Sequence, residues 1–310
     1  SEVYLMAGEY AKAEEAALQV INSGYFHLMN ERFGAQKDQP GDVFSDMFLE
    51  YNQNRTSGNM ESIWVMQLEY DTTTGGGGAN EDWTKRAWVP KYWNETGFIL
   101  CDSLGGRGLA QIVPFKWWID EDGFYTANDV RNSKYNIKRT WYYNNPETPE
   151  LLGKEAPVTE STWSKCTIYP VITKFFYGKT DDSPSYEGNN KDRMKFRLAE
   201  TYLLLAEARI RQNNASGAAE AINVVRKRAG APDITASQAT MDFLLDERIR
   251  ELVGEELRRL TLVRTGKLVE RTRKYNSYSN KIDEHHALWP IPQTIIDSNT
   301  GADFPQNTGY

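Results

Sequence analysis

Hydrophobic residues recur every three to four positions near both ends of the chain, and this spacing predicts amphipathic helices. We expect four helical segments, over residues 2–21, 195–212, 216–228 and 241–263. Asn22, Ser23 and Gly24 follow the first segment and Gly266 lies just beyond the last, as is typical where helices end. The two ends of the chain are therefore predicted to be helical.

The pattern changes between residues 33 and 190. Residues 62–68 predict one short strand, and four consecutive glycines at 75–78 follow it. Most of the remainder combines Gly, Asn, Asp and Pro with aromatic residues, which is typical of loops. A region this long with so little regular structure is usually functional, so we expect a binding site within it.

Small and apolar residues on the predicted helices follow the register of a tetratricopeptide helix pair. The contact positions are occupied by Ala206, Ala218, Ile222 and Val225. Ala13 and Ala17 take the equivalent places in the first segment, so we expect all four segments to pack together. In this register the first helix begins before Ser1, which predicts that the chain is the C-terminal portion of a longer protein. Any helical hairpin with alanines at its contact is the alternative interpretation.

Composition excludes some classes of function. Acidic residues outnumber basic ones by 43 to 36 over 310 residues, and the net charge is −7. This balance argues against a general nucleic-acid binder, which needs a clustered basic surface. Two cysteines, Cys101 and Cys166, are too few for a disulfide scaffold or a zinc site. They either form one disulfide bridge or remain two thiols. Neither has a neighbouring histidine, so neither is predicted to be catalytic.

Aromatic residues are in excess, with nine tryptophans and seventeen tyrosines. Six of the tryptophans lie between residues 64 and 118, and three are evenly spaced by five, among amide, acidic and basic residues. A sugar ring needs such a combination, because its C–H face stacks on a flat apolar surface while its hydroxyls need polar partners. We predict a glycan site in region 80–118, built from Trp83, Trp88, Trp93, Tyr92, Trp117, Trp118, Asn80, Arg86 and Asn94.

Core packing is the alternative for each tryptophan, because large aromatic side chains are mostly buried. Trp64, in the predicted strand, and Trp289, between Leu288 and Pro290, are expected in the core. Other chemistry is poorly supported. The run Gly106-Arg107-Gly108 lacks the third glycine of a phosphate-binding loop. With only three histidines in the chain, a hydrolytic triad is poorly supported. A glycosidase needs only two carboxylates, so it stays an alternative.

Several segments resemble motifs of the SusD/RagB family. Residues 197–208, 221–230 and 247–255 are similar to three of its helical motifs, and the chain closes with segments similar to "L-x-P-I-P" and "Q-N-P-G-Y", at 288–292 and 306–310. These motifs cover roughly residues 191–310 in the family's order. In the third helical motif, Glu247, Arg248 and Glu251 are spaced for ion pairs within the helix, which favours a structural role over a catalytic one.

The resemblance implies a mainly α fold in which tetratricopeptide-like helical hairpins support a long, irregular, loop-rich region with few short strands. We expect one SusD-like domain with four segments. These are a truncated helical repeat at 1–30, an irregular aromatic-rich glycan-binding region at 31–190, a helical repeat bundle at 191–275, and an extended C-terminal segment that packs on the helices at 276–310.

The resemblance also implies a function without catalysis. It predicts a glycan-binding protein, held by a lipid anchor at the outer-membrane surface of a Bacteroidetes-type bacterium, that delivers its ligand to a TonB-dependent, SusC-like transporter. It implies no cofactor, no metal, no nucleic acid and no catalytic residue, and membrane contact only through an anchor in a preceding part of the protein. A carbohydrate-active hydrolase and a helical-repeat scaffold that binds protein are the alternatives.

Overall fold

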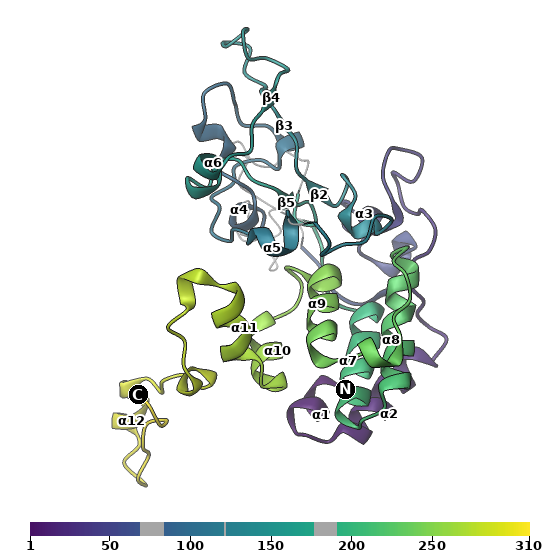
Figure 1. Cartoon of the computed structure of the whole chain (residues 1–310), viewed down its shortest axis with the longest axis vertical. Coiled ribbons are helices and arrows are strands. Elements are labelled where there is room, and N and C mark those ends of the chain that lie inside the picture. The colour runs from purple at the N-terminus through teal and green to yellow at the C-terminus, as the bar shows by residue number, and fades with distance from the viewer. Residues whose placement is uncertain (69–83, 121, 177–190) are drawn as a thin grey trace. The chain divides into compact units, whose positions relative to one another are not determined.

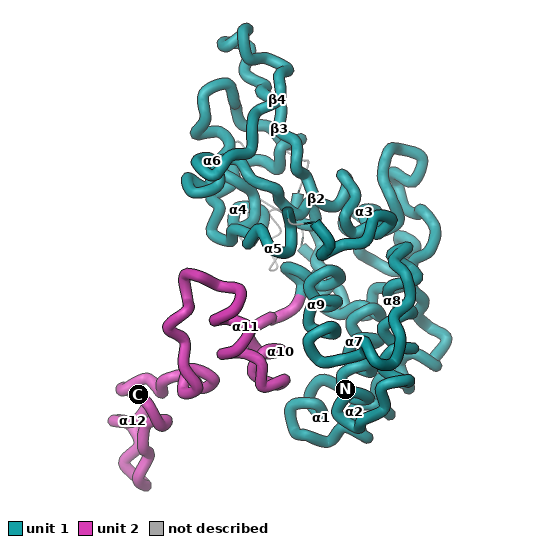
Figure 2. Tube along the Cα trace, in the orientation of Figure 1, with its two compact units in different colours: residues 1–255 teal, residues 256–310 magenta. Residues whose placement is uncertain are grey.

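A computed structural model of the chain describes residues 1–68, 84–120, 122–176 and 191–310. They form two compact units, residues 1–255 and 256–310 (Figure 2). The boundary between the units falls within the predicted segment 191–275. In the parts of the chain that are described, no helix has both the length and the apolar character needed to cross a lipid bilayer.

The first unit contains a layer of helices drawn from both ends of its sequence (Figure 1). These helices are α1 (Glu2–Met6), α2 (Tyr10–Ile21), α7 (Leu198–Arg211), α8 (Ala215–Arg228) and α9 (Met241–Leu252). Helix α7 lies at the centre of the layer and contacts α2, α8 and α9. The mainly α fold predicted from the sequence is therefore confirmed.

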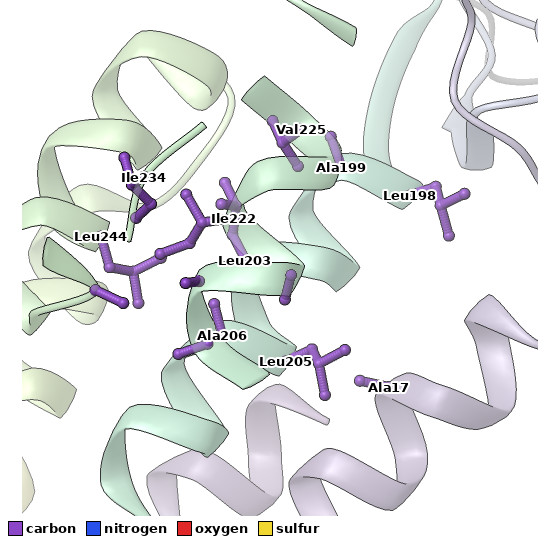
Figure 3. Packing of buried hydrophobic residues seen from close by; sticks show 14 of the residues in the cluster. Ala17, Leu198, Ala199, Leu203, Leu205, Ala206, Ile222, Val225, Ile234 and Leu244 are labelled. Atoms are coloured by element: carbon purple, nitrogen blue, oxygen red, sulfur yellow. The ribbon is translucent and has the colours of Figure 1, made fainter. Parts of the chain in front are cut away.

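Small residues make the close helix contacts that the repeat register predicted. Ala13 and Ala17 are fully buried. Ala17 belongs to the same apolar cluster as Leu205 and Ile222 (Figure 3), and Ala13 packs with Ala208. Because alanine carries only a methyl group, the backbones of α2 and α7 can approach closely. The prediction that the N-terminal helix packs with helices far away in sequence is confirmed.

Two of the predicted helices are each interrupted by a glycine. Segment 2–21 divides into α1 and α2 at Gly8, whose φ is +76°, and segment 241–263 ends α9 near Gly254, whose φ is +79°. A positive φ cannot occur inside a right-handed α-helix and favours glycine. The start of segment 195–212 is also different, because residues 193–197 form a strand and the helix begins at Leu198. The periodicity located the helices but not these interruptions.

Among the described residues, three antiparallel two-stranded ribbons form in and beside the loop-rich region, β1 with β6, β2 with β5 and β3 with β4. Their bounds are β1 (Ser62–Met66), β2 (Ile137–Lys138), β3 (Trp141–Tyr142), β4 (Glu155–Ala156), β5 (Val171–Ile172) and β6 (Arg193–Arg197). Short helical turns precede and separate these strands, namely α3 (Val43–Asp46), η1 (Arg55–Ser57), α4 (Thr84–Trp88), η2 (Tyr92–Asn94), η3 (Asp102–Leu104), α5 (Lys116–Ile119), η4 (Val130–Asn132) and α6 (Glu160–Ser164). One more turn, η5 (Ala236–Gln238), precedes α9.

Aromatic side chains give this region a core of its own. One cluster gathers Tyr92, Trp141 and Tyr169. Another contains Trp88 and Trp118, and Ile249 of α9 and the adjacent Val253 pack against it. Packing of large rings here replaces the regular hydrogen bonding of a sheet or helix layer. Much of the aromatic excess in the sequence is therefore structural.

Trp64 is a correction to the sequence analysis, which expected it in the core. Its side chain is 54% exposed and contacts Phe196 of β6, with 6.0 Å between ring centroids. The two residues face each other across the β1–β6 ribbon. A two-stranded ribbon that packs through one face leaves its other face to solvent, so a tryptophan in a strand is not necessarily buried.

Buried ion pairs join the loop-rich region to the helices. The Arg131 guanidinium of η4 is 2.7 Å from the Glu247 carboxylate of α9 and 3.1 Å from that of Glu251. It also pairs with Asp129 at 2.7 Å. The network continues through further ion pairs that involve Glu61, Glu255, Lys174, Arg197, Arg226 and Arg228.

The carboxylates of the third helical motif thus serve a purpose that the sequence did not reveal. One pair lies within the helix, between Arg250 and Glu247 at 3.0 Å. The other partners of Glu247 and Glu251 come from η4, α8 and β6. The motif therefore ties distant segments together, in addition to the pairing along one helix that was expected.

The second unit consists of α10 (Arg258–Thr265), α11 (Leu268–Tyr275), η6 (Ser277–Ser279), η7 (Glu284–Ala287) and α12 (Gln293–Ser298). The two closing motifs bind each other in this unit. The Gln306 side-chain oxygen accepts from the Ile291 N–H at 2.7 Å, and its amide donates to the Ile291 carbonyl at 2.8 Å. The prediction that Trp289 lies in the core is also wrong, because its side chain is 67% exposed. The Arg259 guanidinium lies 4.4 Å from its ring centroid.

Candidate functional site

The predicted glycan-site residues occupy three short turns of the loop-rich region. Trp88 and Arg86 belong to α4, Tyr92, Trp93 and Asn94 form η2, and Trp117 and Trp118 belong to α5. Trp83 and Asn80 lie outside the described residues.

Three of the predicted aromatic residues are buried. Trp88 is 7% exposed and stacks on Phe175, with 5.7 Å between ring centroids. Tyr92 is fully buried, and its hydroxyl donates to the Cys101 carbonyl at 3.1 Å and accepts from the Cys101 N–H at 3.0 Å. Trp118 lies in the same apolar cluster as Trp88. These rings contact protein on the surfaces that a sugar would need.

Trp93 combines a fixed orientation with accessible ring surface. Its side chain is half-buried at the edge of the cluster around Tyr92. The indole N–H donates to the Gly108 carbonyl at 3.0 Å, and the Arg107 guanidinium carbon is 5.4 Å from the ring centroid. Asn94 follows on the same turn and is exposed. We call Trp93, Asn94 and Arg107 the Trp93 platform.

Trp117 is the other half-buried tryptophan of the predicted set. Its ring meets the edge of Phe124 with 5.3 Å between centroids and a nearly perpendicular interplanar angle of 89°. Phe124 in turn lies against the Arg250 guanidinium of α9, 4.5 Å from its ring centroid. Trp117 therefore offers part of a ring, but it takes part in the packing that attaches α5 to its surroundings.

A glycine-rich turn fixes the rim of the Trp93 platform. The Leu109 N–H donates to the Arg86 carbonyl at 2.7 Å, and the Ala110 N–H donates to the Val89 carbonyl at 3.0 Å. A Cβ at Gly108 would lie 2.1 Å from the Val89 carbonyl oxygen, so only glycine fits this close approach. The glycine run was visible in the sequence, but no role for Arg107 followed from it. The glycines on both sides of that arginine were the available signal.

Burial and charge perturb the basic groups near the platform. Burial, and after it the charge of Arg107, lowers the pKa of the Arg86 guanidinium. Burial likewise lowers the pKa of Lys138, which lies 5.0 Å from the Trp141 ring centroid. Burial is thus the larger cause of both shifts, and the like charge of Arg107 adds to it only at Arg86.

The buried carboxylates of α9 are poorly suited to acid–base catalysis. Burial alone would raise the pKa of Glu247, but Arg131, Arg250 and Arg226 together lower it, and Arg228, Arg197 and Arg131 do the same for Glu251. A glycosidase needs one carboxyl group whose raised pKa keeps it protonated. These two groups are ionised and fully enclosed by guanidinium groups, so they fit a structural network.

Metal-binding and redox chemistry find little support in the portion of the chain that the structure describes. No group of three or more histidine, cysteine or acidic side chains is arranged there to hold a metal ion. Cys101 and Cys166 are separate, half-buried thiols. What this portion offers is a half-buried indole with polar neighbours.

The chain belongs to the SusD family, whose profile matches residues 40–310. This is a family of non-catalytic binding proteins. The starch-binding protein SusD of Bacteroides thetaiotaomicron is 26% identical over the whole of this chain and 59% of its own length. The SusD-like protein P38 of Formosa agariphila is 25% identical over 94% of this chain and 54% of its own length.

Solved structures show the same fold. Surface glycan-binding protein A of Bacteroides thetaiotaomicron, in complex with laminarihexaose, superposes with a TM-score of 0.67 at 22% identity, covering 99% of this chain and 62% of that protein. A SusD-like protein of Bacteroides fragilis gives a TM-score of 0.68 at 18% identity, covering 100% and 63%. The chain thus spans about three-fifths of the length of these relatives.

Proposed function

We propose that this protein binds glycans at the cell surface without cleaving them, and that the Trp93 platform is part of its binding site. The observation that carries the proposal is a half-buried indole, held by its own N–H, with a guanidinium over its ring and an exposed amide beside it, in a chain of the SusD family. The names of two relatives support it, since one is a starch-binding protein and the other was solved with laminarihexaose.

The physical basis of binding is the two-sided character of a sugar ring. Its C–H face loses water when it stacks on Trp93, while its hydroxyls exchange hydrogen bonds with water for hydrogen bonds with Asn94 and its neighbours. A platform that is already fixed loses little conformational entropy when the ligand arrives. Trp88, Tyr92, Trp118 and Arg86 support the platform from the core in this proposal. Trp117, Trp83 and Asn80 stay candidate contacts.

The proposal includes a destination for the ligand. We infer that the whole protein is lipid-anchored at the outer-membrane surface and hands the glycan to a TonB-dependent, SusC-like transporter. Family membership supports this inference. Co-purification of a SusC-like transporter with the tagged protein from native membranes tests it, and recovery of the protein alone would count against it.

Affinity electrophoresis of the full-length protein in gels that contain starch, laminarin or other glycans tests binding. We expect retardation by at least one glycan and no new reducing ends, whereas a hydrolase would release them and a protein-binding scaffold would not be retarded. Trp93→Ala should weaken binding by about 5- to 150-fold, on the scale of about 1–3 kcal/mol for stacking on an aromatic side chain. Trp64→Ala, which removes an exposed tryptophan elsewhere, is the matched control. Equal binding by both variants would place the site elsewhere.

A further inference from the structure

The last part of the second unit has no apolar interior of its own. The structure describes all of residues 272–310, and no side chain among them is buried. The apolar side chains that the second unit buries belong to α10 and α11 and are those of Leu262, Leu268 and Val269. Because burial of apolar surface is the main force that stabilises a fold, residues 272–310 lack this stabilisation within the structure.

Hydrogen bonds nevertheless order the closing segments of this part. The Asn307 amide donates to the Trp289 carbonyl at 2.8 Å, and the Tyr310 hydroxyl donates to the Leu288 carbonyl at 3.0 Å. These bonds add to the pair between the two closing motifs that is described above. Hydrogen bonds of exposed groups contribute little net free energy, because water offers equivalent partners. The conformational entropy lost when the segments become ordered therefore requires a further source of stability.

The same hydrogen bonds bring large, exposed apolar residues close together. Leu288 is 51% exposed, Trp289 67% and Tyr310 44%, and all three belong to the segments that these bonds join. Single exposed apolar side chains are ordinary on a protein surface, but a contiguous group of them marks a contact surface. We call Leu288, Trp289 and Tyr310 the closing face.

The helical layer of the first unit shows little apolar surface that could match the closing face. Helices α2, α7 and α9, which lie wholly within the described residues, expose no large apolar side chain. Those exposed elsewhere in the layer are Val3, Tyr4 and Met6 of α1 and Val224 of α8. The relatives, in contrast, have a large part with no counterpart in this chain, which spans about three-fifths of their length. The family profile extends through the closing face to residue 310.

We propose that the closing face is a docking surface within the full-length protein, covered by an apolar surface of the part that lies outside residues 1–310. This contact supplies the burial that residues 272–310 lack. Trp289 is then buried in the full-length protein, against a part of the polypeptide that this chain does not include. The inference goes beyond the proposed function and does not depend on glycan binding.

Photo-crosslinking of the full-length protein identifies what covers the closing face. With p-benzoylphenylalanine in place of Trp289, we expect crosslinked peptides that mass spectrometry maps outside residues 1–310. The same photoreactive residue in place of Tyr142, which is 51% exposed on β3, is the matched control and should form few crosslinks. Crosslinks to residues 1–255, or between two differently isotope-labelled copies, overturn the proposal. So does the absence of crosslinks from position 289 and from position 295 in α12.

The stability of the full-length protein gives a second measurement without a photoreactive residue. Within residues 1–310, Trp289 is more exposed than Tyr142, so Trp289→Ala should lower the urea midpoint of unfolding no more than Tyr142→Ala does. A covered closing face reverses this order, because truncation of a buried tryptophan destabilises a protein more than truncation of an exposed tyrosine. A smaller loss for Trp289→Ala than for Tyr142→Ala overturns the proposal. Neither measurement uses a glycan, so this inference and the proposed function fail independently.

Discussion

The helical layer and the loop-rich region of the first unit both have buried apolar interiors, but they form them by different means. In the helices, alanines and leucines at regular spacing bury one face, as Ala17 and Leu205 do. In the loop-rich region, large rings such as Trp88 and Trp141 fill the interior with hardly any regular structure around them. Periodicity therefore identifies buried positions in the first case and carries no such information in the second.

This difference explains why the sequence does not show which tryptophans are buried and which are exposed. A tryptophan on a loop has the same sequence context whether it fills a core or presents a platform, because no repeating pattern distinguishes inside from outside. Trp88 and Trp93 are five residues apart with similar neighbours, yet one is buried against Phe175 and the other is only half-buried. Their contrast gives the most direct way to separate stability from binding.

Trp88→Ala should cause the largest loss of stability, about 3–5 kcal/mol, because it leaves a cavity in an aromatic cluster. Trp93→Ala should reduce the free energy of unfolding clearly less than Trp88→Ala does, and it should weaken glycan binding more than Trp88→Ala does. Urea unfolding of both variants, followed by tryptophan fluorescence and circular dichroism, measures the first quantity. Nearly equal unfolding midpoints for the two variants would show that Trp93 is as much a part of the core as Trp88.

Arg131→Met tests the connection between the two regions and should cost about 3–5 kcal/mol, because it removes the guanidinium that pairs with buried Asp129 and takes one of several cationic partners from Glu247 and Glu251. The control is Arg273→Met, which breaks an exposed pair with Asp283 and should change stability by less than about 1 kcal/mol. Equilibrium unfolding compares them. A loss below about 1 kcal/mol for Arg131→Met would mean that the network is dispensable for holding the regions together.

The same network predicts how stability depends on pH. The pKa values of Glu247, Glu251 and Glu255 are lowered in the folded protein by the arginines and Lys174 around them. A lowered folded-state pKa stabilises the protein fully above the carboxyl pKa of the unfolded chain, about 4.3, and this contribution is lost as pH falls toward the folded-state values. The urea concentration at the midpoint of unfolding should therefore decrease as the pH falls below about 4.5. It should change little between pH 6 and 8. Glu251→Gln should reduce the loss of stability at low pH. An unchanged loss in this variant would contradict the role assigned to Glu251.

The sequence predicted the helices, their mutual packing and the fold class because each follows from local spacing that many residues share. It could not predict the network around Arg131, whose partners come from segments more than a hundred residues apart. It also missed Arg107, because the glycines beside it were compared with a phosphate-binding loop rather than with the needs of a tight backbone approach. Long-range pairing and close packing are set by the whole fold, so no local pattern contains them.

The smallest expected effect concerns the glycines that interrupt the predicted helices. A Cβ at Gly8 would meet nothing within 4 Å, so Gly8→Ala should cost only the strain of a positive φ, about 1–2 kcal/mol. Gly254 has a similar φ, but its Cβ would lie 2.5 Å from the Phe175 ring, so Gly254→Ala should cost more than Gly8→Ala. Gly8→Asn should recover part of the loss, because asparagine tolerates left-handed backbone better than alanine. Thermal unfolding of the three variants separates backbone strain from steric exclusion. If Gly8→Ala were instead stabilising, residues 2–21 would favour the continuous helix that their periodicity predicts, and the break at Gly8 would not be an intrinsic preference of this segment.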